Sequence, residues 1–300
     1  MGVRGYRMAG EKGYQRVLWI ALFLLPSLLG LLVFKLIPII SSLGLTLFEW
    51  DLLTPPEFVG LGNFERLIKD RDFLSALQHT LTFIIGYIPL VMALGLGVAV
   101  ALNQRIRGKT AFRTLFYLPV VSSWVAVALL WKWIFNPRFG LVNFGLSLLG
   151  IDGPGWLFDP NWAMPAIILT SVWKDIGFVM IMFLAGLQGI PEVYYEAASI
   201  DGATSWQRFW RITLPLLSPT TFFALVITLI NSFQLFDQVW IMTGGGPAGA
   251  TSVVVEQIVN NAFRYSRMGY AATLSWALFA LVFLITIFQM RLQRRWVTYE

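Results

Sequence analysis

Residues 189–215 read GIPEVYYEAASIDGATSWQRFWRITLP and lie between two long apolar stretches of the chain. Pro191 is a suitable first helical residue, and Glu192 suits the positive end of a helix dipole. Gly202 then permits a sharp turn because it has no Cβ atom. Beyond the turn, residues recur at the i, i+3, i+4 spacing of an amphipathic helix, at Ala203, Trp206, Phe209, Trp210 and Thr213. The stretch therefore predicts two short helices joined at a bend.

The apolar stretches around this loop are long enough to cross a membrane. With 57% hydrophobic and only 13% charged residues, the composition excludes a soluble enzyme. A run of about 18 or more uncharged residues can cross the hydrocarbon core as a helix. Five runs meet this length: Val17 to Phe34 with its continuation to about Phe48, Thr80 to Gln104, Thr114 to Trp131, Ile212 to Phe236, and Met268 to Met290. We predict a sixth span at Trp162 to Gln188, which is apolar except for Lys174 and Asp175.

The positive charges predict how these spans are oriented. Cytoplasmic loops carry the excess of Lys and Arg beside the ends of spans. With the amino terminus inside, four groups of positive residues fall on the cytoplasmic side: Arg4, Arg7, Lys12 and Arg16; Arg105, Arg107, Lys109 and Arg113; Arg208 and Arg211; and Arg291, Arg294 and Arg295. We therefore predict an all-α polytopic membrane protein with six transmembrane helices and both termini cytoplasmic. The same clustering accounts for the net charge of +6 without a nucleic-acid partner.

The residues of the loop also match a family pattern in order and spacing. Glu196 to Pro215 fit E-A-A-x-x-D-G-A-x-x-x-x-x-F-x-x-I-x-L-P. This resembles the EAA loop of binding-protein-dependent ABC importer permeases. The resemblance includes the six-span core and Thr243 to Pro247 after the fifth span, and it is greatest to the carbohydrate-uptake branch, in particular the first permease of maltose-type and glycerol-phosphate-type systems. It implies a type I ABC importer permease fold, with residues 1–300 as one transmembrane permease domain and residues 189–219 as a cytoplasmic coupling loop within it.

The resemblance also implies function and partners. The residues that it assigns to ATPase coupling are Glu196, Ala197, Ala198, Asp201, Gly202, Ala203, Phe209, Leu214 and Pro215. The implied partners are a second homologous permease, two copies of a cytoplasmic ABC ATPase, an extracytoplasmic solute-binding protein and the lipid of a prokaryotic plasma (inner) membrane. The expected function is to form the translocation path for a sugar, an oligosaccharide or a related polyol or glycerol-phosphate solute.

The sequence offers no residues for catalysis. It contains no cysteine and a single histidine, His79, which excludes disulfides, thiolate metal sites and cysteine nucleophiles. Gly108-Lys109-Thr110 is not a phosphate-binding loop, because Asn103 stands where that pattern requires glycine. We therefore expect a transport subunit and not an enzyme, with no catalytic residue, no metal and no cofactor. ATP must be hydrolysed by another chain.

Polar residues within the fourth and fifth spans mark a candidate substrate path. Lys174 and Asp175 lie near the centre of span four, where ionisable side chains are costly and generally face a cavity or a partner. Adjacent residues on a helix do not face each other, so these two are not expected to neutralise one another. The family resemblance adds Ser171. Span five contributes the amides, hydroxyl and carboxylate that suit sugar hydroxyls, at Asn231, Ser232, Gln234 and Asp237.

These residues leave alternatives open. They can instead pack against neighbouring helices or the partner permease. A phosphate-bearing cargo would use Lys174 as its anion partner, whereas a neutral sugar would depend on Asn231, Gln234 and Asp237. A different class of protein, an ion-coupled secondary transporter, would use Lys174, Asp175 or Asp237 as a relay. Its uptake would be sensitive to uncouplers and indifferent to loss of the ATPase.

Overall fold

The computed structural model describes residues 13–104 and 106–297, and this part of the chain is mainly helical. The positive residues Arg4, Arg7, Lys12 and Arg105 lie outside the described residues. Four described helical segments are long and apolar enough to cross a membrane, and two bent helix pairs pass the same test. When each bent pair counts as one crossing, the described residues contain the six spans predicted from the sequence.

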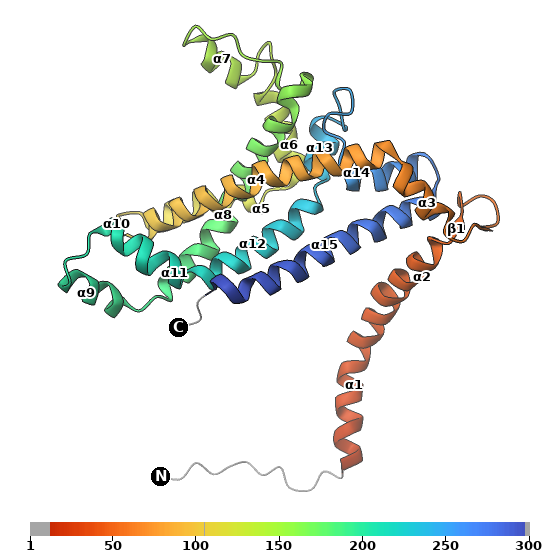
Figure 1. Ribbon diagram of the computed structural model, residues 1–300, viewed down its shortest axis with the longest axis horizontal. Coiled ribbons are helices and arrows are strands. Elements are labelled where there is room, and N and C mark those ends of the chain that lie inside the picture. The colour runs from red at the N-terminus through yellow and green to blue at the C-terminus, as the bar shows by residue number, and fades with distance from the viewer. Residues whose placement is uncertain (1–12, 105, 298–300) are drawn as a thin grey trace.

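The first crossing, Leu18–Leu45, leans away from the rest of the molecule (Figure 1). It consists of α1 (Gly13–Leu31), the π-helical turn η1 (Leu32–Leu36) and α2 (Ile37–Leu45). None of the residues in its most apolar window is buried by the rest of the described chain. This span is therefore held mainly at its α2 end, where Trp276 Nε1 donates to Ser42 Oγ at 3.1 Å.

Four long helices form the body of the molecule and run beside one another in Figure 1: α4 (Arg71–Asn103), α8 (Pro160–Gln188), α12 (Ser218–Phe233) and α15 (Met268–Trp296). The most extensive packing is between α4 and α8. Gly95 permits this approach, because a Cβ atom there would lie 2.7 Å from Val179 Cγ1. The centre of the bundle is formed by almost fully buried side chains, including Phe83, Val91, Ile167, Met180, Phe183 and Phe233.

Aspartate caps determine where the two central helices begin. The Asp70 carboxylate accepts hydrogen bonds from the backbone N–H groups of Asp72 and Phe73 at the start of α4. Asp159 accepts from Asn161 N at the start of α8, and Pro160 occupies the first helical position. These caps satisfy backbone donors that a helix leaves unpaired at its N-terminus. They place the two starts earlier in the chain than the apolar runs indicated.

Two crossings are bent, so neither of these two apolar runs forms one continuous helix. The run Thr114 to Trp131 forms α5 (Lys109–Val121) and α6 (Trp124–Ile134), which meet at 98°. Ser122 is extended, and the Ser123 hydroxyl accepts from Val125 N to begin the second helix. A short polar side chain can thus end one helix and cap the next within an apolar run.

The run Ile212 to Phe236 is also divided. Its first residues belong to η3 (Phe209–Thr213) and α11 (Leu214–Leu216), which together with α10 (Ser205–Arg208) meet α12 at a bend of 63°. At its other end, α12 stops at Phe233, and α13 (Asp237–Met242) begins only after an irregular segment, residues 234–236. Hydropathy did not indicate either break.

A small collar connects the end of the first span to the body. It contains the two-stranded sheet of β1 (Phe48–Glu49) and β2 (Glu57–Phe58), in which Phe48 pairs with Phe58, and α3 (Gly62–Lys69). Buried Asn63 donates from its amide to the carbonyls of Thr46 and Phe48, both at 2.9 Å. Tyr270 on α15 donates to Asp70, so the collar also includes the start of α4. We define the collar as residues 46–70 and 267–270.

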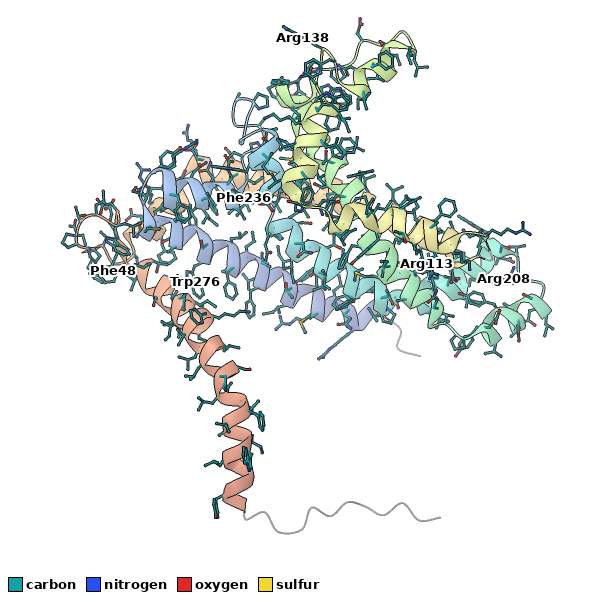
Figure 2. All side chains as sticks on the ribbon, turned by 180° about the vertical axis from the view of Figure 1, so that it is seen from behind. Phe48, Arg113, Arg138, Arg208, Phe236 and Trp276 are labelled. Atoms are coloured by element: carbon teal, nitrogen blue, oxygen red, sulfur yellow. The ribbon has the colours of Figure 1, made fainter. Side chains whose placement is uncertain are left out.

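Further short elements lie in the loops between the crossings, namely α7 (Leu141–Ser147), η2 (Trp156–Phe158), α14 (Val254–Val259) and η4 (Asn260–Arg264). Arg113 and Arg208, which belong to the predicted clusters of Lys and Arg, lie at the end of the bundle opposite the collar (Figure 2). Trp296 at the end of α15 contacts Phe222 there, with ring centroids 6.1 Å apart. The distribution agrees with one basic end, and the cytoplasmic placement of both termini stays a prediction.

Candidate functional site

The loop between α8 and α12 projects from the basic end of the bundle (Figure 1). Its first helix is α9 (Glu192–Ile200), and Pro191 stands one residue before that helix and not at its first position. Gly202 follows with a φ of +76°, a left-handed conformation that other residues rarely adopt. A capping box between Thr204 and Gln207 then begins α10. The two short helices and the bend expected from the sequence are present.

Hydrogen bonds connect the two arms of this loop. The Tyr195 hydroxyl on α9 lies 3.1 Å from Thr213 Oγ1 on η3. Arg208 donates from Nη1 to Ser199 Oγ at 2.9 Å, and the backbone N–H of Ala203 donates to Ala198 O at 2.9 Å. Because the contacts join residues before and after Gly202, the loop forms one compact unit. These hydrogen bonds connect α9 with α10 and η3, which precede α12 in the chain.

The outer face of α9 is exposed and has few partners in the chain. Ile200 is 88% exposed and Val193 is 61% exposed. The Glu196 and Asp201 carboxylates make no side-chain hydrogen bond or ion pair within the described residues. This combination of apolar and acidic groups is available for contact with another protein.

The other residues assigned to coupling lie in the same unit. Ala197 and Pro215 are exposed, whereas Ala198, Ala203, Phe209 and Leu214 are partly buried. Phe209 packs on the rings of Trp206 and Trp210, with the Trp210 centroid 5.6 Å away. The partly buried members therefore shape the loop, and the exposed members form its surface.

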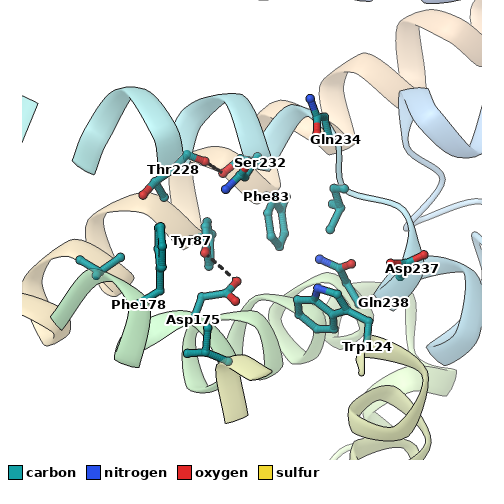
Figure 3. A pocket seen from close by; sticks show the side chains of 14 residues that line it. Phe83, Tyr87, Trp124, Asp175, Phe178, Thr228, Ser232, Gln234, Asp237 and Gln238 are labelled. Carbon is teal, nitrogen blue, oxygen red and sulfur yellow. Dashed lines mark hydrogen bonds between the residues drawn. The ribbon is translucent and has the colours of Figure 1, made fainter. Parts of the chain in front are cut away.

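A cavity of about 290 Å³ lies in the middle of the bundle (Figure 3). Its walls come from α4, the bend between α5 and α6, α8, α12 and the irregular segment that leads to α13. Five of the seven predicted path residues line it: Asp175, Asn231, Ser232, Gln234 and Asp237. The structure thus brings these five residues of the fourth and fifth spans together at one cavity, and their role in a substrate path stays a prediction.

Asp175 is held at the cavity wall by a residue from another helix. The Tyr87 hydroxyl on α4 donates to Asp175 Oδ2 at 2.9 Å, as the dashed line in Figure 3 shows. Trp124 and Gln238 are among the side chains labelled across the cavity from this pair. An aromatic ring and hydrogen-bonding groups therefore line one cavity, as in sites that bind polar organic ligands.

Lys174 and Ser171 do not line this cavity. Lys174 is 4% exposed, its ammonium donates to Val120 O at 3.0 Å, and it lies 4.8 Å from the centre of the Trp124 ring. Ser171 is buried, donates to Ile167 O and lies 3.5 Å from Gln238 Nε2. The two residues lie behind wall residues. Lys174 and Asp175 form no ion pair with each other, as the helical spacing predicted.

Other wall residues were missed by sequence reasoning. Phe83, Tyr87 and Trp124 come from spans two and three, and Gln238 comes from α13. The hydroxyl of Tyr87 in a long apolar run was one signal, and the serine pair before Trp124 was another. The convergence itself depends on how separate helices pack, which no single run reveals.

The backbone beside the cavity is irregular. Phe236 has a φ of −148° and a ψ of −63°, outside the helical region, between the end of α12 and the start of α13. Non-helical backbone within a membrane is tolerated where it is enclosed by protein or lines a polar cavity. Gln234 and Leu235 of this segment do line the cavity. A broken helix at a polar site is typical of transport proteins.

These features define a polytopic membrane permease, which has a cavity between its spans and a loop that projects from the basic end of the bundle. Residues 92–298 match the family described as "Binding-protein-dependent transport system inner membrane component". The chain belongs to this family, as the loop pattern indicated. It is accordingly a multi-pass inner-membrane transport subunit and not an enzyme.

Relatives of nearly equal length support the assignment. The chain is 40% identical over 283 residues to the probable ABC transporter permease protein YesP of Bacillus subtilis, covering 93% of this chain and 91% of YesP. It is 39% identical over 274 residues to the lactose transport system permease protein LacF of Rhizobium radiobacter, covering 89% and 91%.

A solved structure agrees with the fold. A chain from a bacterial ABC transporter involved in importing the acidic polysaccharide alginate matches with a TM-score of 0.83 and 29% identity. The match covers 94% of this chain and 96% of that one. The fold expected from the sequence, that of an ABC importer permease, is therefore confirmed, and the chain is an ABC importer permease of the sugar-transport type.

Proposed function

We propose that this chain forms one half of the translocation path for a sugar or oligosaccharide and that its 189–219 loop couples the path to a separate ATPase. The complete importer would contain a second homologous permease, two copies of a cytoplasmic ABC ATPase and an extracytoplasmic solute-binding protein. The family description, which names a binding protein, supports the last of these partners.

The exposed outer face of α9 carries this proposal. Ile200 and Val193 present apolar surface beside the unpaired carboxylates of Glu196 and Asp201. An ATPase groove with apolar walls and basic or amide groups would cover this face. Tyr195 and Arg208 connect α9 to the second arm of the loop, so movement of the ATPase would reach α12. Such a link is the physical requirement for alternating access driven from outside the membrane.

The cavity supports a second permease as a partner. Asn231, Gln234 and Asp237 are exposed in the single chain, although they lie where α12 ends within the bundle. Polar side chains at this depth are unfavourable against lipid tails. A second subunit placed opposite them would complete a polar path, and we propose that these residues face its centre.

The sugar cargo is supported by both the site and the relatives. The cavity combines aromatic faces with amide and carboxylate groups, which suit stacking on pyranose rings and hydrogen bonding to hydroxyls. LacF carries lactose in its name, and the alginate transporter imports a polysaccharide. A saccharide is the cargo that agrees with these observations.

The coupling surface is tested by replacing Ile200 with glutamate in the reconstituted complex. We expect the added charge to weaken association with the ATPase by about tenfold or more, because an unpaired charge would be buried at the contact. Ile68→Glu is the matched control, since Ile68 is 76% exposed on α3 at the opposite end. Co-purification of the ATPase and stimulated ATP hydrolysis are the measurements. Equal loss in both variants would contradict a contact at α9.

The bend in the loop is tested at Gly202. A valine cannot easily adopt the φ of +76°, and the left-handed conformation costs roughly 1–2 kcal/mol for such residues. Gly202→Asn is the control, because asparagine tolerates this conformation. We expect Gly202→Val to lower sugar-stimulated ATP hydrolysis while Gly202→Asn largely preserves it. Normal transport by the valine variant would show that the bend is not needed for coupling.

The ion-coupled alternative is not favoured. The chain belongs to a binding-protein-dependent family, and its buried ionisable groups are not arranged as a relay. Asp175 is paired with Tyr87, whereas Lys174 is paired with the carbonyl of Val120. Uptake that continued without the ATPase and stopped with an uncoupler would restore this alternative.

A further inference from the structure

The ionisable side chains that line the cavity include two carboxylates. These belong to Asp175 and Asp237, and no lysine, arginine or histidine of the described chain is among the lining residues. The remaining polar wall groups are neutral hydroxyls and amides, at Tyr87, Thr228, Asn231, Ser232, Gln234 and Gln238. An anionic ligand would therefore meet two carboxylates and no positively charged lining residue from the described part of this subunit.

The nearest lysine is already engaged away from the cavity. Lys174 donates to Val120 O at 3.0 Å and lies over the ring of Trp124, and its side chain is almost fully buried. Trp124 is itself a lining residue, so the aromatic ring and not the ammonium faces the cavity. To contact a ligand, Lys174 would have to give up both contacts. The Lys174 ammonium, which is the group best suited to bind a phosphate or carboxylate, therefore does not face the cavity.

The wall groups suit a neutral polyhydroxyl ligand. Asp175 uses Oδ2 for Tyr87, and its Oδ1 has no hydrogen-bond partner within the described residues. A carboxylate oxygen is a strong acceptor for a sugar hydroxyl. Phe83, Trp124 and Phe178 supply apolar faces beside these acceptors. The wall therefore offers many hydrogen bonds without a positive centre.

We infer that this permease selects neutral saccharides and rejects those that carry a carboxylate or phosphate. The inference rests on the proposed function, because it assumes that the cavity is the sugar path. The relatives alone do not decide the matter, since one carries the name of lactose and another transporter imports an acidic polysaccharide. The two carboxylates are the features that discriminate, and like charges placed together disfavour the wrong partner.

The test uses the absence of cysteine from the chain. The thiols of the other subunits are blocked before the importer is assembled. Gln234→Cys then places one reactive thiol at the cavity wall of the assembled importer. The rate of alkylation by N-ethylmaleimide is then measured against rising concentrations of a saccharide. Maltose, lactose and trehalose are the neutral probes, and the same disaccharides with one C6 hydroxyl oxidised to a carboxylate are the anionic probes. Protection of the thiol reports occupancy without depending on the binding protein.

We expect the neutral sugar to protect at a concentration at least about tenfold lower than its anionic counterpart. Asp175→Asn and Asp237→Asn, each added to Gln234→Cys, should reduce this ratio severalfold by weakening the repulsion. Asp152→Asn is the matched control, because it removes one carboxylate from an exposed loop residue that does not line this cavity. It should leave the ratio unchanged.

The outcomes separate this inference from the proposed function. Equal or better protection by the anionic sugar, or a ratio unaffected by both aspartate variants, overturns the inference. Absence of protection by any probe, while loaded binding protein still stimulates ATP hydrolysis, also overturns it because the cavity would not be the sugar site. If no saccharide stimulates hydrolysis in the complete importer, the proposed function itself fails.

Discussion

The first span and α8 are similar in length but differ in their packing. The first span has 28 residues, and its most apolar window has a mean hydropathy of 2.5 and is not buried by the described part of the chain. Helix α8 has 29 residues, and its most apolar window has a lower mean hydropathy of 1.8, yet 56% of that window is buried. The less apolar helix lies at the centre because it carries the polar residues that need protein neighbours. High hydropathy therefore indicates contact with lipid or another subunit more than burial within this chain.

The largest expected difference between these two regions comes from removing an aromatic side chain. Phe183 on α8 is 1% exposed, whereas Phe34 in the first span is 80% exposed. Phe183→Ala should reduce the free energy of unfolding by about 3–5 kcal/mol because it leaves a cavity. Phe34→Ala should change it by less than about 0.5 kcal/mol. Thermal unfolding of both variants in nanodiscs measures the difference, and similar losses would contradict the packing described for α8.

The next difference concerns adding a methyl group. A Cβ atom at Gly177 on α8 would lie 2.0 Å from the backbone oxygen of Phe116 on α5, whereas nothing lies within 4 Å at Gly30. Gly177→Ala should therefore destabilise the protein by roughly 1–3 kcal/mol. Gly30→Ala should be neutral or slightly stabilising, since alanine is the better helix former. A stable Gly177→Ala variant with unaltered unfolding temperature would show that α5 and α8 can separate without cost.

A third prediction sharpens the comparison at the point where the first span is attached. Asn63→Ala would leave two backbone oxygens without their amide donor, the buried one of Thr46 and the partly buried one of Phe48. We expect a loss of about 1–3 kcal/mol, concentrated in the collar. Hydrogen exchange of residues 46–58 should rise while exchange in α8 stays unchanged. Uniformly faster exchange would indicate that the collar and the bundle unfold together.

The smallest effect is expected at the contact between α2 and α15. Ser42→Ala removes the acceptor for Trp276 Nε1 and should cost about 0.5–1.5 kcal/mol. Ser41→Ala is the control, because Ser41 is exposed on the same helix and has no side-chain hydrogen bond within the described residues. Unfolding temperatures of the two variants should differ by a small but reproducible amount. Equal values would mean that this hydrogen bond does not secure the span.

Much of the fold could be predicted because the deciding signals are local. Apolar runs determine which segments cross the membrane, and the Gly202 bend depends on one residue that can adopt a positive φ. The breaks after Val121 and Phe233 could not be predicted from hydropathy, since the apolar character continues across both. There, Ser123 caps a new helix, and Phe236 adopts a conformation set by its surroundings.

The candidate site was only partly predictable for the same reason. An ionisable residue within a predicted span, Asp175, and the polar residues of span five could each be identified from the sequence as candidates for the substrate path. The direction of each side chain depended on partners from other helices: Tyr87 holds Asp175 at the cavity, and the carbonyl of Val120 holds Lys174 away from it. Lys174 and Asp175 are neighbours in the sequence, but contacts with other helices direct their side chains to different places. The sequence of one span does not contain this information.

The collar also has a consequence for the order of events during synthesis. Tyr270 donates to Asp70, which is 200 residues earlier in the chain. At translation rates of about 5–20 residues per second, Tyr270 is synthesised roughly 10–40 s after Asp70, when the first span is already complete. During that interval the span has no native partner on the bundle side of the collar. Its solubility in the lipid bilayer, and not its later hydrogen bonds, must keep it inserted while the rest of the protein is made.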